Sequence, residues 1–379
     1  MKKVLFVLPY YKIGGTLTSF SNLIPLIDKT KYEVEVFAIT NEVDDISILP
    51  KGINYIGLNL RRFNKKGQKR NIKTYIIKFL KLGKRLLATL GYDPSSAVFK
   101  KMAQPLSGKY DIVIAFQEGQ PTKMAQFISA PYKIAWIHSM YSRFKAISKC
   151  SATDVYNYYD NIVCVSQTAA ADMINSEPQW KRKIHVVYNA INFDAVVEKA
   201  EREIVLYKKI NFVSVGRIDP VKRFSLIPQI ASEIKKVGIS FDWWIIGGIA
   251  IRKEYNKLTD SIKQYDVSDC VHIVGALSNP YPYIKYSDLL VCLSSSETFN
   301  YTIAEAKAIG TPIVSTDFPS AFEFLENEKT GLILPIEDVA SGIIRILNDK
   351  KLYDSVKQNL CNKSVEITKE QLETLLENE

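Results

Sequence analysis

Short β-rich runs alternate with helix-length segments along the whole chain, and this alternation is the feature that most limits its fold. Strands that alternate with helices form parallel sheets, because each strand must be followed by a crossover connection. A charged stretch from 194 to 209 separates the runs into two sets. The first set comprises 4–9, 34–39, 53–58, 111–116, 133–138, 162–166 and 184–188. The second comprises 210–216, 241–247, 271–275, 289–293, 312–315 and 331–334.

Two sets of strands predict two α/β domains, each a doubly wound parallel sheet. A chain of 379 residues is long enough for two such domains with ordinary cores. We expect an N-terminal Rossmann-like domain over 1–195 and a C-terminal one over 205–379, whose last helix crosses back. Ligands of such sheets bind beyond the carboxyl ends of the strands, so a cleft between the domains is the expected site.

Composition excludes several protein classes. With 47% apolar and 24% charged residues, the chain is typical of a soluble globular protein, not of a disordered, collagenous or coiled-coil one. Its five cysteines lack CxxC spacing, which argues against a disulfide framework and favours a reducing compartment. Three scattered histidines argue against a His-rich metal site, so any metal would need carboxylates. No apolar run reaches the 18 or so residues of a spanning helix, so we expect a soluble or peripheral protein. With the reducing compartment, this predicts a cytoplasmic location.

The positive charge is concentrated in one segment. The net charge is +10, and residues 61–101 contain 13 Lys/Arg and a single acid. On a helical wheel an apolar face lies opposite Lys73, Lys78, Lys81, Lys84 and Arg85. Such a helix can lie on an anionic membrane surface, here the inner face of the cell membrane. The alternative is a surface helix that packs its apolar face on the domain. Nucleic acid is not favoured, because no binding motif surrounds the segment.

A glycine pair, Gly14-Gly15, follows the first expected strand and precedes a helix that starts near Leu17. Glycines let the backbone approach a ligand closely, and a helix N-terminus presents unpaired N–H groups to an anion. A tight turn is the simpler alternative, because no complete GxGxxG motif is present.

The first strand of the second set leads into Gly216 and Arg217, with Lys222 close behind. Pro220 predicts a helix start, which places Lys222 in the first turn of the next helix. A guanidinium and an ammonium beside a helix N-terminus suit a diphosphate. Two solvated surface cations are the alternative.

Two glutamates follow the strand 289–293. Glu297 ends the loop, and Glu305 lies inside the next helix among apolar neighbours. A carboxylate on an apolar face needs a partner, and a ribose diol offers two donors. Structural glutamates paired to a lysine or to the backbone are the competing interpretation.

In this order, the motifs resemble those of the retaining glycosyltransferases of family 4, which have the GT-B fold. The resemblance covers nearly the whole chain and is strongest from 211 to 335. It rests on the glutamate pair, Gly216-Arg217 with Lys222, the early glycine pair, and the segment 310–314 with Glu323, Gly331 and Pro335. The segments 115–119, 135–138 and 279–284 are similar to members that build capsular, exopolysaccharide or O-antigen repeat units.

The resemblance implies a role for each matched residue. Arg217 and Lys222 would neutralise the diphosphate leaving group of a nucleotide sugar, and Glu297 would hold the donor sugar. His138 and Glu118 would face the reacting sugar and the acceptor. The implied donor-binding residues are Gly14, Gly15, Gly216, Thr298, Phe299, Asn300, Tyr301 and Glu305, with backbone amides on the β-phosphate and Glu305 on the ribose. His138 as a core histidine is the alternative for that residue.

The implied reaction moves a hexose or N-acetylhexosamine from a nucleotide sugar, with UDP favoured, to a glycan acceptor that the basic helix suggests is lipid-linked. Negative charge grows on the β-phosphate as the bond breaks, so fixed cations and amides there stabilise the transition state. No metal or cofactor is implied, and the leaving phosphate takes the acceptor proton. A non-catalytic scaffold and a nucleotide-sugar epimerase stay open as alternatives.

The chain departs from the family at one loop. Where the family usually has glycines flanking the phenylalanine, this chain has Thr298 and Asn300. Asparagine tolerates left-handed backbone better than most residues, so we expect the loop geometry to survive, with donor choice open to change.

Overall fold

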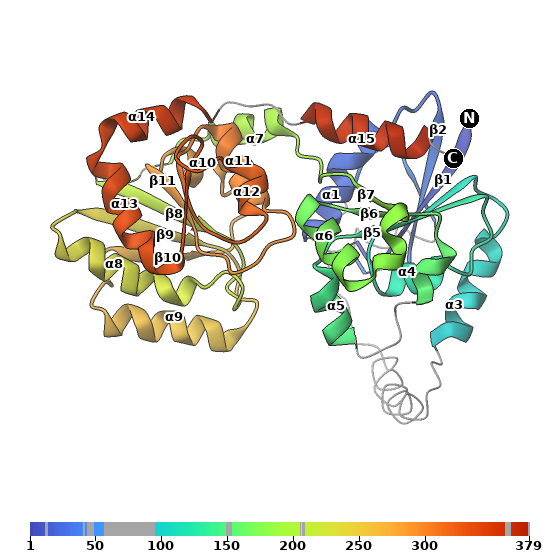
Figure 1. The fold of residues 1–379 in the computed structure, drawn as a ribbon, viewed down its shortest axis with the longest axis horizontal. Helices are drawn as coiled ribbons and strands as arrows, with labels where there is room; N and C mark the ends of the chain where they lie inside the picture. The colour runs from blue at the N-terminus through green and yellow to red at the C-terminus, as the bar shows by residue number, and fades with distance from the viewer. Residues whose placement is uncertain are drawn as a thin grey trace, which may run out of the picture. The chain divides into compact units, whose positions relative to one another are not determined.

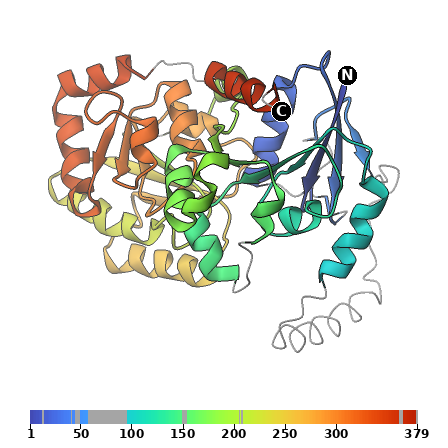
Figure 2. The ribbon, with the colours of Figure 1, turned by 45° about the vertical axis from the view of Figure 1, so that its right-hand side comes forward.

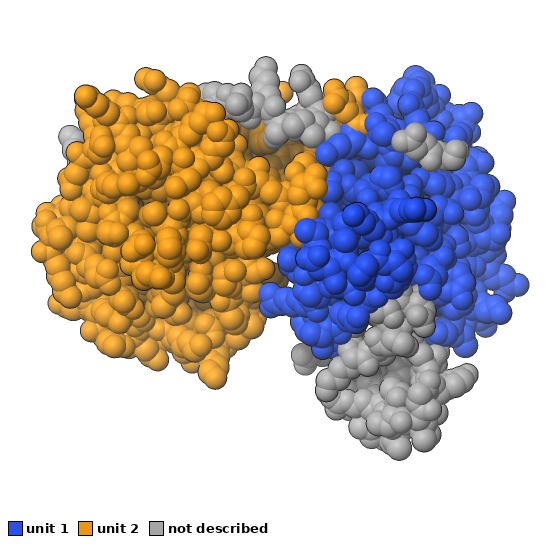
Figure 3. Space-filling view, in the orientation of Figure 1, with its two compact units in different colours: residues 1–165, 169–187, 371–379 blue, residues 166–168, 188–370 orange. Residues whose placement is uncertain are grey.

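The computed structural model describes residues 1–11, 14–40, 42–43, 49–56, 95–148, 154–204, 206, 209–360 and 365–377. The chain divides into two compact units, coloured separately in Figure 3. The first unit comprises 1–165, 169–187 and 371–379, and the second comprises 166–168 and 188–370. The main division therefore falls at 187–188, ahead of the expected boundary near 195, and the end of the chain groups with the first unit.

The first unit is built on a seven-stranded parallel sheet with the order β3-β2-β1-β4-β5-β6-β7. Each expected run of the first set is a strand. The strands are β1 (Lys2–Leu8), β2 (Tyr32–Ala38), β3 (Asn54–Ile56), β4 (Ile112–Ala115), β5 (Tyr132–Ile137), β6 (Asn161–Cys164) and β7 (Ile184–Val186).

The second unit is built on a six-stranded parallel sheet with the order β10-β9-β8-β11-β12-β13. Each run of the second set is again a strand. The strands are β8 (Ile210–Val215), β9 (Phe241–Ile246), β10 (Val271–Gly275), β11 (Leu289–Cys292), β12 (Ile313–Thr316) and β13 (Leu332–Leu334). The expected fold class, two doubly wound α/β domains, is confirmed.

Helices flank both sheets (Figure 1, Figure 2). Those of the first part of the chain are α1 (Gly15–Leu23), α3 (Ser95–Ala103), α4 (Gln120–Ala125), α5 (Tyr141–Ser148) and α6 (Gln167–Ser176). Those that follow are α7 (Phe193–Ala200), α8 (Ile227–Lys236), α9 (Arg252–Gln264), α10 (Tyr281–Lys285), α11 (Tyr301–Ile309), α12 (Ala321–Phe324), α13 (Val339–Asn348), α14 (Lys350–Gln358) and α15 (Val365–Glu377). The short helix expected in the connection is α7, which Asn192 caps through its side chain.

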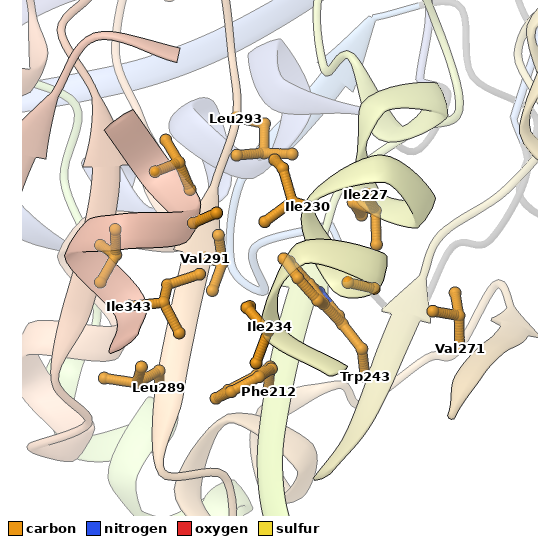
Figure 4. Close-up of a cluster of buried hydrophobic side chains, with 14 of the residues drawn as sticks. Phe212, Ile227, Ile230, Ile234, Trp243, Val271, Leu289, Val291, Leu293 and Ile343 are labelled. Carbon is orange, nitrogen blue, oxygen red and sulfur yellow. The ribbon is translucent and has the colours of Figure 1, made fainter. Parts of the chain in front are cut away.

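The second sheet buries both of its faces, which is why its strands read as apolar runs. On one face α8, α9 and α13 cover side chains such as Phe212 and Trp243 (Figure 4). On the other, α10, α11 and α12 cover the neighbouring side chains Val213 and Ile246. The cover on both faces leaves the loops at the carboxyl ends of the strands as the place where polar side chains gather.

The first sheet is covered in the same way. One face packs against α3, α4, α5 and α6 through residues such as Val113 and Ile162. On the other face α1 contributes Phe20, whose ring lies 5.5 Å from that of Phe6 and 5.8 Å from that of Phe116. Edge-to-face aromatic pairs of this kind add to the burial of apolar area.

The basic segment 61–101 lies largely outside the described residues, and so do Lys73, Lys78, Lys81, Lys84 and Arg85. Among the residues that are described, no helix is both long and apolar enough to cross a bilayer. Three cysteines of the described ranges, Cys164, Cys270 and Cys292, are buried and free.

Candidate active site

Most of the expected site residues gather where the strand order of the second sheet reverses. Strands β8 and β11 are neighbours there, and their connections leave in opposite directions. In doubly wound sheets this switch point, at the carboxyl ends of the strands, is where ligands bind. The loop after β8 carries Gly216, Arg217 and Lys222, and the loop after β11 carries Glu297 through Asn300.

Glycines follow two neighbouring strands, β8 and β9, and allow close contacts at the strand ends. Gly216 and Gly247 both have φ 155°, a region that side chains rarely adopt. A Cβ on Gly247 would lie 1.7 Å from the carbonyl oxygen of Gly216, and a Cβ on Gly216 would lie 2.8 Å from Cε of Lys222. Gly216 is therefore needed so that the Lys222 chain can cross the strand end. Gly247 was missed from the sequence, although its position after β9 matches that of Gly216 after β8.

The turn after Gly216 differs from the expected helix start. The carboxylate Oδ1 of Asp219 accepts from the backbone N–H groups of Val221, at 3.0 Å, and Lys222, at 3.1 Å. Arg223 then has a left-handed backbone with φ 51°, so helical structure begins only with the 3₁₀ turn Phe224–Leu226 and α8. The expectation that Lys222 lies in the first helical turn was wrong, because the Asp219 side chain closes a separate turn ahead of the helix.

Lys222 and Glu297 form an ion pair at the centre of the site. Lys222 Nζ lies 2.6 Å from Glu297 Oε1, and the two side chains are 18% and 17% exposed. Burial is the largest single influence and lowers the pKa of Lys222, but the charge and hydrogen bond of Glu297, together with the charges of Cys292 and Asp219, raise it above its ordinary value. The hydroxyl of Ser294 donates to the same Glu297 oxygen at 2.8 Å. Both charges are thus fixed before any ligand arrives.

Arg217 contrasts with Lys222. Its side chain is 78% exposed and lies 3.6 Å from Asp219 Oδ2. A guanidinium held this loosely keeps most of its donors available to an anion.

Arg223, which the sequence analysis passed over, joins the two loops. Its guanidinium donates to the carbonyl oxygens of Leu293, at 2.6 Å, and Ser294, at 2.8 Å. The amide of Ser295 donates to the carbonyl of Val221 at 2.8 Å. These bonds hold the β8 and β11 loops together, so Arg223 acts as a structural residue rather than as a third ligand cation.

The loop 297–301 also differs from expectation. Asn300 has φ −99° and is the N-cap of α11, with its Oδ1 accepting from the amide of Ile303 at 3.1 Å. Neither Asn300 nor Thr298 has a left-handed backbone. The loop therefore does not use the conformational tolerance of Asn300, whose side chain instead caps α11. Its side chain is buried, which leaves the backbone of the loop to meet a ligand.

Glu305 lies on α11 and faces Tyr281 of α10. The Tyr281 hydroxyl donates to Glu305 Oε1 at 3.0 Å. Burial raises the pKa of Glu305 to about 7, while the Tyr281 hydrogen bond and the Lys222 charge lower it. A carboxylate that titrates near neutrality is typical of functional sites. Tyr281 was not singled out from the sequence as a site residue.

In the first unit, the glycine pair is followed by α1 as expected. Gly14 is the N-cap, with φ 167° and ψ 173°, and Gly15 is the first helical residue. Among the described residues, no atom lies within 4 Å of the place where a Cβ of either residue would stand. Neither packing nor backbone conformation therefore requires glycine here, which leaves room for a ligand at this helix N-terminus.

Glu118 and His138 meet after β4 and β5. Glu118 Oε2 accepts from the amide of His138 at 2.9 Å, and Oε1 accepts from the Ser139 hydroxyl at 2.5 Å. The His138 ring packs edge-on against Phe116, 4.8 Å away, and its Nε2 is buried without a partner among the described residues. Burial lowers the pKa of His138 to about 3, so the imidazole is neutral at physiological pH.

The comparisons with known proteins agree with this geometry. Residues 197–362, which include all of the switch-point residues, match the family described as glycosyl transferases group 1. This part of the chain belongs to that family. The chain is a glycosyltransferase, as the sequence analysis predicted.

Curated relatives of this glycosyltransferase include two bacterial enzymes. It is 25% identical over 316 residues to the N-acetylgalactosamine-N,N'-diacetylbacillosaminyl-diphospho-undecaprenol 4-alpha-N-acetylgalactosaminyltransferase of Campylobacter jejuni, covering 79% of this chain and 82% of that one. It is 26% identical over 214 residues to the lipopolysaccharide core biosynthesis glycosyltransferase LpsE of Rhizobium meliloti, covering 55% and 60%.

Solved structures share the fold. The Anabaena protein Alr3699/HepE, crystallised with UDP and glucose, superposes with a TM-score of 0.73 at 15% identity over all of both chains. A glycosyltransferase from Rickettsia africae superposes with a TM-score of 0.69 at 16% identity, covering 100% of this chain and 99% of that one. The glycosyltransferase thus has the GT-B fold that its motifs predicted.

The structure brings Gly216, Lys222, Glu297 and Glu305 into one region and places His138 with Glu118 in another, in the first unit. The residues that sequence reasoning missed are Asp219, Arg223, Gly247 and Tyr281. Only Gly247 carried a local signal, as a glycine at a strand end. Within the described ranges, no group of three or more His, Cys, Asp or Glu is placed to hold a metal ion.

Proposed function

We propose that this glycosyltransferase transfers a hexose or N-acetylhexosamine, with retention of anomeric configuration, from a UDP-sugar to a lipid-linked glycan in cell-surface polysaccharide assembly. Three names support the proposal. The C. jejuni relative is named for a diphospho-undecaprenol substrate, the R. meliloti relative for lipopolysaccharide core biosynthesis, and the Anabaena structure for bound UDP and glucose.

The Lys222–Glu297 ion pair carries the proposal. An ammonium has three donors, and Glu297 takes one of them, so two remain for a diphosphate oxygen. Arg217, nearby on the same turn, adds an exposed guanidinium that can fork onto two oxygens. Charge that develops on the β-phosphate as the glycosidic bond breaks then meets the Lys222 ammonium, which is already held in place by Glu297.

The proposed retention follows from attack on the same face that the leaving group departs. In that scheme the acceptor hydroxyl forms the new bond to the anomeric carbon while its proton passes to the departing β-phosphate oxygen. No protein base is assigned. His138 is not assigned as the base, because a pKa of about 3 makes its imidazole too weak a base to hold the acceptor proton at neutral pH. The neutral imidazole is suited instead to a hydrogen bond with the reacting sugar.

A nucleotide panel tests the donor part. We would measure thermal unfolding with UDP, GDP, ADP, CMP and dTDP, with magnesium and with EDTA, on the wild type and on Arg217→Ala. A ligand at 100 times its Kd adds about 2.7 kcal/mol to the unfolding free energy. We expect stabilisation by UDP that is independent of magnesium and reduced in the variant. Because Arg217 is largely exposed, its replacement should leave the unliganded protein within about 0.5 kcal/mol.

The outcomes separate the alternatives. Stabilisation by no nucleotide would favour a non-catalytic scaffold. Release of free nucleotide or an altered donor sugar without any acceptor would favour an epimerase. Retention is read from the anomeric coupling constant of the product, and an inverted product would contradict that part of the proposal.

A liposome assay tests the lipid-linked part, which rests on the basic segment and on the relatives' names. Replacing Lys73, Lys81, Lys84 and Arg85 by glutamine should weaken binding to anionic vesicles, because each basic residue near the surface contributes roughly 1 kcal/mol. The control replaces four exposed lysines of the second unit instead: Lys253, Lys263, Lys350 and Lys351. Equal binding by the two variants would remove the membrane from the proposal.

A further inference from the structure

Tyr281 is held in place by packing as well as by its hydrogen bond. Its ring lies against the cluster of Ile191, Val196 and Ala304, where α7, α10 and α11 meet. Its backbone amide donates to the Asn279 side chain at 3.3 Å, and Asn279 in turn donates to the carbonyl of Lys199 at 2.9 Å. The hydroxyl therefore has a fixed position from which it reaches Glu305.

Glu305 is only half satisfied by this contact. Oε1 accepts from Tyr281 at 3.0 Å, whereas Oε2 has no hydrogen-bond partner within the part of the chain that is described. Glu305 is half-buried, and its Oε2 is open to solvent. A partly buried carboxylate with one fixed oxygen and one open oxygen is prepared to accept hydrogen bonds from a ligand.

We propose that Tyr281 is a positioning residue for donor binding: its hydroxyl fixes one oxygen of Glu305 so that the other accepts from the ribose hydroxyls of the nucleotide. The inference rests on the proposed function, since it assigns a positioning residue to the same donor site. Tyr281 touches no reacting atom itself. It acts by orienting the Glu305 carboxylate and by favouring its ionised form.

The groups that face Glu305 determine the sign of the pH dependence. They are Tyr281 from α10 and Lys222 from the turn after β8, and both favour the carboxylate. Burial opposes them and raises the pKa of Glu305 to about 7. Below that pH the carboxyl is protonated and accepts more weakly, so ribose recognition should weaken as the pH falls. Without the Tyr281 hydroxyl, the pKa of Glu305 should rise further, so ribose recognition should begin to weaken at a higher pH.

The experiment compares UDP with 2′,3′-dideoxy-UDP on the wild type, Tyr281→Phe and Tyr283→Phe, by calorimetry from pH 5.5 to 8.5. If the nucleotide panel selects GDP, the guanosine pair replaces the uridine pair. Tyr283 is the matched control, because it lies on the same helix but packs against Trp244. The measured quantity is the affinity ratio of the two nucleotides, which cancels base and phosphate contacts.

In the wild type and in Tyr283→Phe, we expect UDP to bind at least roughly tenfold more tightly than 2′,3′-dideoxy-UDP at pH 8, because hydrogen bonds to charged groups are strong. That ratio should fall as the pH drops below about 7. In Tyr281→Phe the ratio should be severalfold smaller, and its decline should begin about one pH unit higher. Phe keeps the ring, so a merely structural role would not shift this profile.

Two failures are distinguishable. If the wild type binds no nucleotide, the proposed function fails. If the wild type prefers UDP over its dideoxy analogue but Tyr281→Phe shows the same ratio and the same pH profile, the proposed function stands and the role of Tyr281 is overturned.

Discussion

At the residue scale, the cations expected to meet a phosphate differ in how they are held. Lys222 is paired with Glu297 in a partly buried position, and Arg217 is largely exposed beside Asp219. Removing one member of a buried pair costs more than removing both, because an unpaired charge remains. A single and a double replacement of the Lys222–Glu297 pair can therefore separate the contribution of Lys222 to stability from its proposed contribution to catalysis.

We therefore predict that Lys222→Met lowers the unfolding free energy by about 1–3 kcal/mol and kcat/KM by roughly 10²–10³-fold. The double variant Lys222→Met with Glu297→Gln should regain part of the stability but none of the activity. Urea unfolding and initial-rate kinetics on the three proteins measure both effects. Recovery of activity in the double variant would show that the Lys222 charge does not act on the leaving group.

At the scale of elements, the ends of the strands set the positions of the site residues. Gly216 and Gly247 end neighbouring strands of one sheet, and the carbonyl of Gly216 fills the space that a side chain on Gly247 would need. Gly248, the next residue, has only an ordinary contact of 3.7 Å with Ala276. The two adjacent glycines therefore make a matched pair.

Gly247→Ala should destabilise the protein by about 3 kcal/mol or more, because both φ and the available space forbid a side chain. Gly248→Ala should change stability by less than about 1 kcal/mol. Thermal unfolding and soluble yield measure the difference. Similar melting temperatures for the two variants would contradict the close approach of the strand ends.

The start of α1 shows the opposite behaviour, since no contact with the described residues demands glycine there. Gly15→Ala should leave stability unchanged or raise it by about 0.5–1 kcal/mol, because alanine favours the helix. If a diphosphate approaches this helix N-terminus, the added methyl group should weaken nucleotide binding severalfold. Thr18→Ala, an exposed position of the same helix, is the control. Unchanged affinity in Gly15→Ala would remove the glycine pair from the donor site.

At the scale of the whole molecule, the proposed donor site reduces stability. Glu305 has its pKa raised from 4.5 to about 7, so the folded state holds its proton more tightly than the unfolded chain does. Its contribution is therefore full below pH 4.5 and is lost as the pH rises to about 7. His138, with its pKa lowered to about 3, acts in the other direction, because its protonation at low pH destabilises the folded state.

Replacing Glu305 by glutamine should therefore stabilise the protein at pH 8, by about 2 kcal/mol, while it weakens nucleotide binding. The gain should shrink toward pH 5.5, where wild-type Glu305 is protonated. The difference between the two proteins at each pH isolates Glu305, because His138 is present in both. A gain independent of pH would show that the Glu305 charge is not the cause.

Much of the architecture could be predicted from the sequence alone. All thirteen expected runs are strands. The central ones, such as β4 and β11, are buried along their whole length and therefore form continuous apolar runs in the sequence. The position of the candidate site could be predicted from the same pattern, since the motif residues stand directly after strands. The resemblance to a glycosyltransferase family rested on the order of those motifs. The match of residues 197–362 to the glycosyl transferases group 1 family confirms it.

The partners of the site residues were decided only by the tertiary structure. Glu297 meets Lys222 because β8 and β11 are neighbours in the sheet although they lie far apart in the chain. The contact of Glu305 with Tyr281 likewise depends on how α10 packs beside α11. Local sequence determines which residues stand at a strand end, because β-propensity and the pattern of apolar residues are local properties. It does not determine which charges meet there, because distant segments supply each partner and the burial that shifts its pKa.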